Sequence, residues 1–375
     1  MRDKNKILKG GAVVLLGLMV ILYNSPGVSF VEFMFFQLTP NYSRFFGETD
    51  AFNHTDGMAG IGDLGELVTS VFDINALDDG GENSGMLSVS SLEDLIQTRG
   101  HFTGERFGLN FSAQDMENFR NVSTLLGRFY VLERNPGINN ENFSIDYFIN
   151  ANLHVEKNEM LPQILIFHSH AASEFFRDSP NTTDLEYGIV GVGNTLANIL
   201  RNEYGLNVLH YTGVYDMVNG VVSRDGAYER IEPSIVEILD MYPSIELVID
   251  LHRDGVPEST APEGLFTEID GQRVAQIMFV NGVSAMNIGG EVRNSPWLEN
   301  PYINTNLALS FNLQMAKMSM YPGLSRRMFI TPFRYINHLR PLSVLIEVGT
   351  QRNTMQDVHN AMDPLANVIY SVVFA

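Results

Sequence analysis

Three apolar runs in this chain each lead directly into a cluster of ionisable side chains. Together with their clusters they span 164–170, 247–254 and 344–349. Short apolar runs are typical of strands that are buried on both faces of a sheet. Ligands bind at the carboxyl ends of the strands in open α/β sheets. We therefore expect the histidines and carboxylates of the three clusters to meet at one sheet edge, as the parts of a zinc hydrolase would.

Beyond residue 160, segments with strand character alternate with segments of helical character. This alternation predicts an α/β fold in which a mainly parallel sheet is flanked by helices on both faces. The expected strands are 163–168, 206–212, 246–252, 276–282 and 343–349, and the expected helices lie near 190–203, 227–241, 302–318 and 354–372. A further strand is expected earlier in the chain, at 125–132.

The N-terminal region has a different character. Residues 10–31 carry no charge and follow a segment with four basic side chains. An uncharged stretch of about 20 residues preceded by basic residues predicts a signal anchor with a cytoplasmic N-terminus, which leaves the rest of the chain outside the cytoplasm. A cleaved signal peptide is the alternative, because the densest apolar part covers only 10–23.

Four regions are expected along the chain. The signal anchor, or transmembrane segment, covers 1–27, and a largely irregular spacer rich in Asp, Glu, Gly, Ser and Asn covers 28–109. Residues 110–160 form an N-terminal extension that packs on the catalytic domain, and the catalytic domain itself covers 161–375.

Composition narrows the possible chemistry. The chain has 375 residues, no cysteine and a formal net charge of −20. Without cysteine, any metal ion must be held by His, Asp or Glu. The acidic balance argues against nucleic acid as a partner, because nucleic-acid binding requires cations that neutralise phosphates.

The first cluster offers His168 and His170 as metal ligands on the exit from a strand. Glu174 lies four residues after His170 and would share its face if a helix began there. Glu186 is a rival carboxylate ligand, and His168 is a rival to His170. Hydrogen bonding to a loop backbone is the other interpretation of these histidines.

The second cluster is the sharpest. His252 is a candidate metal ligand, and Asp250 or Asp254 would accept the other ring N–H and fix the tautomer. Arg253 is a candidate for stabilising a developing oxyanion. A purely structural Arg–Asp ion-pair network is the alternative.

The third cluster places a single carboxylate, Glu347, inside an apolar strand. Desolvation would raise its pKa towards the value that a general base requires, and a zinc-bound water would be its partner. A buried ion pair with an arginine such as Arg352 is the alternative interpretation.

From about residue 120 to its end, the chain resembles the stage II sporulation protein P family of endospore-forming bacteria. The residues that carry the resemblance are His168-Ser169-His170 with Glu174, Asp250 to Asp254, Leu345 to Gly349 with Asn353-Thr354, Pro322 to Arg326, and the pair Tyr335 and Asn337. Ser169 departs from the usual Thr, which leaves the candidate ligands unchanged.

The resemblance implies a zinc-dependent N-acetylmuramoyl-L-alanine amidase fold that acts on peptidoglycan, with possible endopeptidase cutting of cross-links. It implies Zn²⁺ held by His170, Glu174 and His252, with Glu347 as the catalytic base. It also implies a single-pass protein of the mother-cell membrane, facing the forespore, that acts in engulfment with the stage II sporulation proteins D and M. The alternatives are a non-catalytic wall-binding subunit and a zinc peptidase that acts on stem peptides.

Overall fold

The computed structural model describes residues 111–257, 259–295 and 298–375. These residues fall within one compact unit of the chain. The expected signal anchor and spacer lie outside the described residues. None of the described helices is long and apolar enough to cross a membrane.

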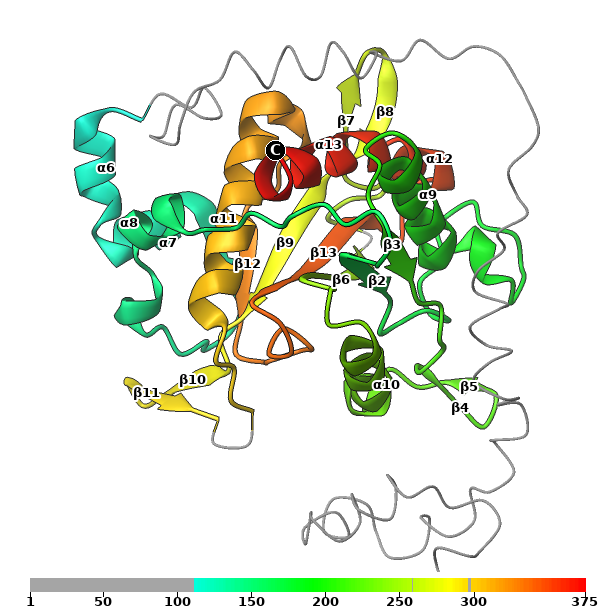
Figure 1. Cartoon of the computed structure of the whole chain (residues 1–375), viewed down its shortest axis with the longest axis horizontal. Coiled ribbons are helices and arrows are strands. Elements are labelled where there is room, and N and C mark those ends of the chain that lie inside the picture. The colour runs from blue at the N-terminus through cyan, green and yellow to red at the C-terminus, as the bar shows by residue number, and fades with distance from the viewer. Residues whose placement is uncertain (1–110, 258, 296–297) are drawn as a thin grey trace, which may run out of the picture. The chain divides into compact units, whose positions relative to one another are not determined.

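A seven-stranded sheet forms the centre of the described unit, in the order β1-β12-β9-β13-β6-β2-β3 (Figure 1). The strands are β1 (Tyr130–Leu132), β2 (Ile164–Phe167), β3 (Val208–His210), β6 (Leu247–Asp254), β9 (Ile277–Gly282), β12 (Met328–Thr331) and β13 (Leu342–Thr350). The expected strands after residue 160 are therefore present, with ends that differ by a few residues.

The sheet is mainly parallel, as expected, with one antiparallel pairing that makes it mixed. Strands β13, β6, β2 and β3 run parallel to one another, and so do β9, β12 and β1, but β9 pairs antiparallel with β13. The chain reaches β9 through the hairpin of β7 (Phe266–Ile269) and β8 (Gln272–Ala275). Since the described residues between β6 and β9 include no crossover helix, β9 starts at the edge where β6 ends and runs back.

Helices cover both faces of the sheet. Helices α11 (Ile303–Met320), α13 (Met362–Val373) and α9 (Ile189–Asn202) lie side by side in that order on one face, where they form the main core. Helix α10 (Ala227–Met241) packs on the other face against alternate residues of the same strands, among them Leu165, Phe167 and Val248. Figure 1 shows α10 apart from the three-helix layer, beside the hairpin of β4 (Met217–Val218) and β5 (Val221–Val222).

Residues 125–132 are mostly helical, so the strand expected there is wrong over most of its length. Helix α7 (Val122–Phe129) begins at the N-cap Asn121, whose Oδ1 accepts the N–H of Thr124 at 3.1 Å. Leu125 and Phe129 lie four residues apart and are both buried, which is helical spacing. Only Tyr130–Leu132 continues as β1, at the sheet edge.

The segment before residue 160 shares the core of the rest. It contributes α6 (Ala113–Phe119), α7, β1 and α8 (Ile145–Asn150). Phe129 packs edge-on against Phe311 of α11 with ring centroids 5.4 Å apart, and Asn312 Nδ2 donates to the Phe148 carbonyl at 2.7 Å. The final expected helix is two helices, α12 (Met355–His359) and α13, separated by Asn360 and Ala361.

Candidate active site

The three polar clusters meet because their strands are neighbours. In the sheet β6 lies between β2 and β13, and the register places Phe167 beside Asp250 and His252 beside Glu347. The parallel direction of these three strands brings their carboxyl ends to one edge. Five of the residues proposed from the sequence gather there, namely His170, Glu174, Asp250, His252 and Glu347.

His252 lies at the centre of this group and is only 2% exposed. Its Nε2 is 2.7 Å from Asp250 Oδ1, and its Nδ1 is 3.2 Å from Glu174 Oε1. Burial alone would lower the pKa of His252, but the two carboxylates hold it well above its usual value. With Nε2 engaged by Asp250, Nδ1 is the ring atom directed at Glu174.

Glu174 is fully buried and lies in an irregular segment after a turn, so the helix considered at this position is absent. Its Oε2 accepts the backbone N–H of Arg253 at 2.8 Å, and its Oε1 accepts from Arg224 at 3.0 Å. Burial would raise the pKa of Glu174, but His252 and Arg253 lower it to about 2. The carboxylate is therefore ionised at neutral pH.

His170 completes the arrangement from the β2 side. Its ring centroid lies 5.3 Å from that of His252, and its Nδ1 is buried without a hydrogen-bond partner. Burial, with further contributions from His252 and Arg224, lowers the pKa of His170 to about 4. A neutral imidazole with an unused buried nitrogen is the form that binds a metal ion.

Imidazole and carboxylate are donor types that zinc binds in proteins. Two ligand atoms that each lie about 2.0–2.1 Å from a tetrahedral zinc ion are about 3.3 Å apart, which matches the separation between His252 Nδ1 and Glu174 Oε1. Among the described residues, no group of three or more His, Asp or Glu side chains is placed to hold a metal ion. The cationic guanidinium of Arg224 contacts the same Glu174 oxygen.

Glu347 faces the cluster from β13. Its Oε2 is buried without a hydrogen-bond partner, and burial raises the pKa of its carboxyl to about 8. An oxygen that no protein group occupies, on a carboxyl that titrates near neutrality, is suited to receive and return a proton.

Four of the proposed residues lie outside the ligand cluster or have other contacts. His168 points under α9, where its Nδ1 donates to the Leu251 carbonyl at 2.7 Å and its Nε2 lies 2.8 Å from His210 Nε2. Glu186 Oε1 accepts a hydrogen bond from Asn194 Nδ2 of α9, and Asn194 Oδ1 in turn contacts His210. Arg253 and Asp254, the other two, contact neighbouring segments.

Arg253 and Asp254 have contacts that hold the surrounding loops. The Arg253 guanidinium donates to the carbonyls of Phe175 at 3.0 Å and Ser173 at 3.1 Å. Asp254 Oδ2 accepts from Arg326 at 2.6 Å. Arg253 is thus directed towards the segment that carries Glu174. Of the two aspartates considered for fixing the His252 tautomer, Asp250 is the one that contacts the ring. The Nε of Arg352, the ion-pair partner considered for Glu347, donates to the Pro262 carbonyl.

Asp216 and Arg224 are site residues that the sequence did not suggest. Asp216 is fully buried, and its two carboxylate oxygens accept the backbone N–H groups of Ala172 at 2.9 Å and Ser173 at 2.8 Å. These contacts clamp the turn between His170 and Glu174. They join residues more than 40 positions apart in a region without a motif, so no local pattern indicates them.

Asp216→Asn is expected to lower the free energy of unfolding by about 1–3 kcal/mol, because an amide NH₂ would face a buried backbone N–H. Urea denaturation monitored by circular dichroism measures the change. Asp225→Asn, an exposed carboxylate nearby, is the matched control and should leave the midpoint unaltered. Equal midpoints for Asp216→Asn and the parent would contradict the clamp.

The raised pKa of Glu347 also predicts a pH-dependent stability of the metal-free protein. Because its folded pKa of about 8 exceeds the ordinary 4.5, its contribution is complete below about pH 4.5 and is lost as the pH rises through 8. The parent should lose a few kcal/mol more than Glu347→Gln between about pH 5 and about pH 9. Urea midpoints across this range measure the difference. If the midpoints of the parent and of Glu347→Gln changed equally with pH, the raised pKa would be refuted.

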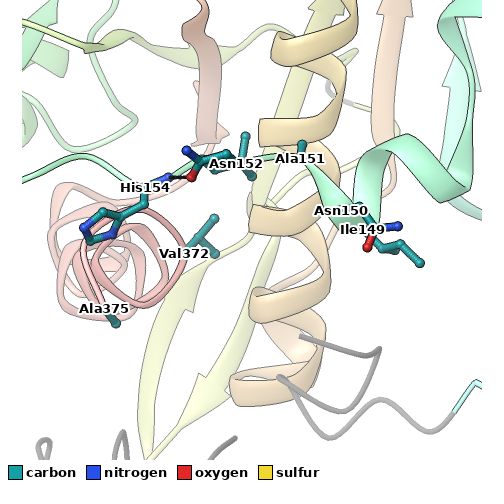
Figure 2. Close-up of a pocket in the computed structure, with 8 residues that line it drawn as sticks. Ile149, Asn150, Ala151, Asn152, His154, Val372 and Ala375 are labelled. Carbon is teal, nitrogen blue, oxygen red and sulfur yellow. Dashed lines mark hydrogen bonds between the residues drawn. The ribbon is translucent and has the colours of Figure 1, made fainter. Parts of the chain in front are cut away.

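A cavity visible in Figure 2 lies away from this cluster. It is lined by the end of α8 and the following segment together with the end of α13, including Asn152, His154, Val372 and Ala375. None of the candidate catalytic or ligand side chains lines it.

The chain has recognisable similarity to known proteins. The model of a family described as Stage II sporulation protein P matches residues 119–370. A search of curated proteins gives no match.

Solved structures similar to this chain include several N-acetylmuramoyl-L-alanine amidases. AmiC2 of Nostoc punctiforme is 14% identical, with 57% of this chain and 96% of that chain covered and a TM-score of 0.34. The enzyme from Clostridium difficile 630 is 13% identical, with 56% and 96% covered and a TM-score of 0.33. The catalytic domain of CwlV from Bacillus (Paenibacillus) polymyxa var. colistinus is 13% identical, with 56% and 96% covered and a TM-score of 0.31.

Proposed function

Since the chain belongs to the stage II sporulation protein P family, we propose that it is a peptidoglycan hydrolase that cleaves the amide between N-acetylmuramic acid and L-alanine. The observation that carries the proposal is the convergence of His170, Glu174, His252 and Glu347 at one sheet edge. Two imidazoles and two carboxylates with opposite pKa shifts supply metal ligands and a base in one place.

His170, Glu174 and His252 would hold a zinc ion, which when bound polarises a carbonyl and lowers the pKa of water. Asp250 Oδ1 accepts a hydrogen bond from the Nε2–H of His252, which fixes the tautomer that leaves Nδ1 available as a ligand. The Arg253 backbone N–H and the Asp216 clamp hold Glu174 and its loop in place. These contacts position the ligands before substrate arrives.

Glu347 carries the proton in the reaction. Its carboxylate accepts a proton from the water whose oxygen forms the new bond to the amide carbon. It returns that proton to the nitrogen as the carbon–nitrogen bond breaks, so that the products are a carboxylic acid on the lactyl group and a free amine on alanine. The unpartnered Oε2 of Glu347 is the oxygen available for this transfer.

We further propose a cellular setting for this activity. Family membership and the basic, then uncharged, N-terminal segment support a single-pass protein with a cytoplasmic N-terminus and an extracytoplasmic catalytic part. Its place would be the mother-cell membrane during engulfment of the forespore, in a complex with the stage II sporulation proteins D and M.

Product analysis tests the proposed reaction. The purified protein with zinc and intact peptidoglycan should release stem peptides that begin with a free alanine amine, identified by mass spectrometry. Products cut only within the cross-links would make the protein a peptidase instead. Sedimentation with the wall in the absence of any release would make it a binding subunit.

A further inference from the structure

A row of aromatic rings leads from the candidate metal ligands to the surface. Ring centroids are 5.5 Å apart between His170 and Tyr228, 5.2 Å between Tyr228 and Tyr335, and 6.2 Å between Tyr335 and Phe333. His170 is 8% exposed and Phe333 is 52% exposed. Tyr228, Tyr335 and Phe333, here called the aromatic row, therefore connect the buried site with solvent.

One residue of the aromatic row, Tyr335, has its backbone in an unfavourable conformation. Tyr335 has a φ of 54°, in the left-handed region that a bulky side chain rarely adopts. Such a conformation costs free energy and persists where the surrounding structure enforces it, commonly at binding sites. The Tyr335 side chain packs against the small cluster of Met278, Val280 and Leu345 beside Glu347.

Phe333 is fixed by its backbone although its side chain is exposed. Its carbonyl accepts the Ser284 N–H at 3.1 Å, and its N–H donates to Thr331 Oγ1 at 3.3 Å. A Cβ on Gly282 would lie 2.4 Å from the Phe333 carbonyl oxygen, so only glycine permits this close approach. The chain thus presents a large apolar ring to water from a rigid support, as binding sites require.

The charges beside the aromatic row are paired with one another. Glu232 of α10 accepts from Arg334 at 2.8 Å and lies 3.3 Å from His338. Flat apolar rings with balanced charges suit a neutral ligand whose own faces are apolar. The pyranose rings of a glycan strand have such C–H faces, whereas a stem peptide carries carboxylates, and the Arg334 guanidinium beside the rings is already engaged by Glu232.

We propose that the aromatic row is a glycan subsite, in which Phe333 and Tyr335 stack on sugar rings of the strand while the amide to be cut lies at the metal ligands. The identity of the substrate rests on the proposed function. The subsite fixes the orientation of that substrate, with the sugar on the side of α10 and the 332–335 segment.

The test measures binding of peptide-free glycan strands to the full-length protein by isothermal titration calorimetry. Phe333→Ala should weaken binding about tenfold, which is about 1.4 kcal/mol. Phe333→Trp should retain it. Val221→Ala, an apolar side chain that is 68% exposed on β5, is the matched control and should bind as the parent does. On intact peptidoglycan, Phe333→Ala should raise KM and leave kcat nearly unchanged.

The outcomes separate this inference from the proposed reaction. Equal glycan affinity of Phe333→Ala and the parent, no glycan binding by the parent, or a loss confined to free stem peptides would each overturn the subsite. Glycan binding that depends on Phe333 in a protein that releases no stem peptides would uphold the subsite and overturn the amidase. Urea midpoints confirm that the variants remain folded.

Discussion

Glu347→Gln is expected to reduce kcat for release of stem peptides by about 10²–10⁴-fold while the protein retains its zinc. The amide has nearly the shape of the carboxyl but cannot accept a proton. Glu347 contacts no proposed ligand through a hydrogen bond, and its Oε2 is without a partner, so the substitution breaks no hydrogen bond at that atom. Stopped assays on peptidoglycan measure kcat, and elemental analysis after dialysis measures the metal.

Glu237→Gln provides the matched control for this prediction. Glu237 is an exposed glutamate on α10 that lies outside both the ligand cluster and the aromatic row. It should keep the parent's kcat. Wild-type turnover by Glu347→Gln, or loss of zinc together with turnover, would contradict the assignment of Glu347 as the base.

His252→Ala is expected to remove both the metal and the activity. The ring contacts Glu174 through Nδ1 and Asp250 through Nε2, so its loss deletes one ligand and leaves two buried carboxylates without the imidazole between them. Removal of a supporting contact to a ligand already costs about 10–100-fold in metal affinity, and removal of the ligand itself should cost more. Competition with a chelating dye measures the zinc affinity.

His168→Asn distinguishes this ligand set from the alternative. His168 contacts the Leu251 carbonyl and His210 on the side of the sheet covered by α9, so this variant should still bind one zinc ion per chain. If His252→Ala retained the metal and His168→Asn lost it, the ligands would have to be sought around His168 instead.

The position of the site could be predicted from the sequence because strand ends are a local feature. Each polar cluster follows its own apolar run, and parallel neighbours bring such ends together. The expected bounds of α9 and α10 also agree closely with the observed ones. The strand expected at 125–132 was wrong over most of its length. There the N-cap Asn121 and the spacing of Leu125 and Phe129 favour a helix over the strand that β-branched and aromatic residues suggest.

The features that the sequence did not reveal depend on contacts between distant segments. The reversal of β9 follows from the β7–β8 hairpin rather than from any property of residues 277–282. Asp216 and Arg224 reach the 170–174 turn from more than 40 residues away, and no periodic pattern marks them. The contact between Glu174 and His252 arises from tertiary packing, because Glu174 lies in an irregular segment.

X-ray diffraction from zinc-loaded crystals, with data collected at the zinc absorption edge, tests the central claim most directly. The account predicts one anomalous peak about 2.0–2.1 Å from a Glu174 oxygen, from Nδ1 of His252 and from a ring nitrogen of His170. A peak at His168 and His210, a peak at Glu186, or no peak at the 170–174 turn would contradict it.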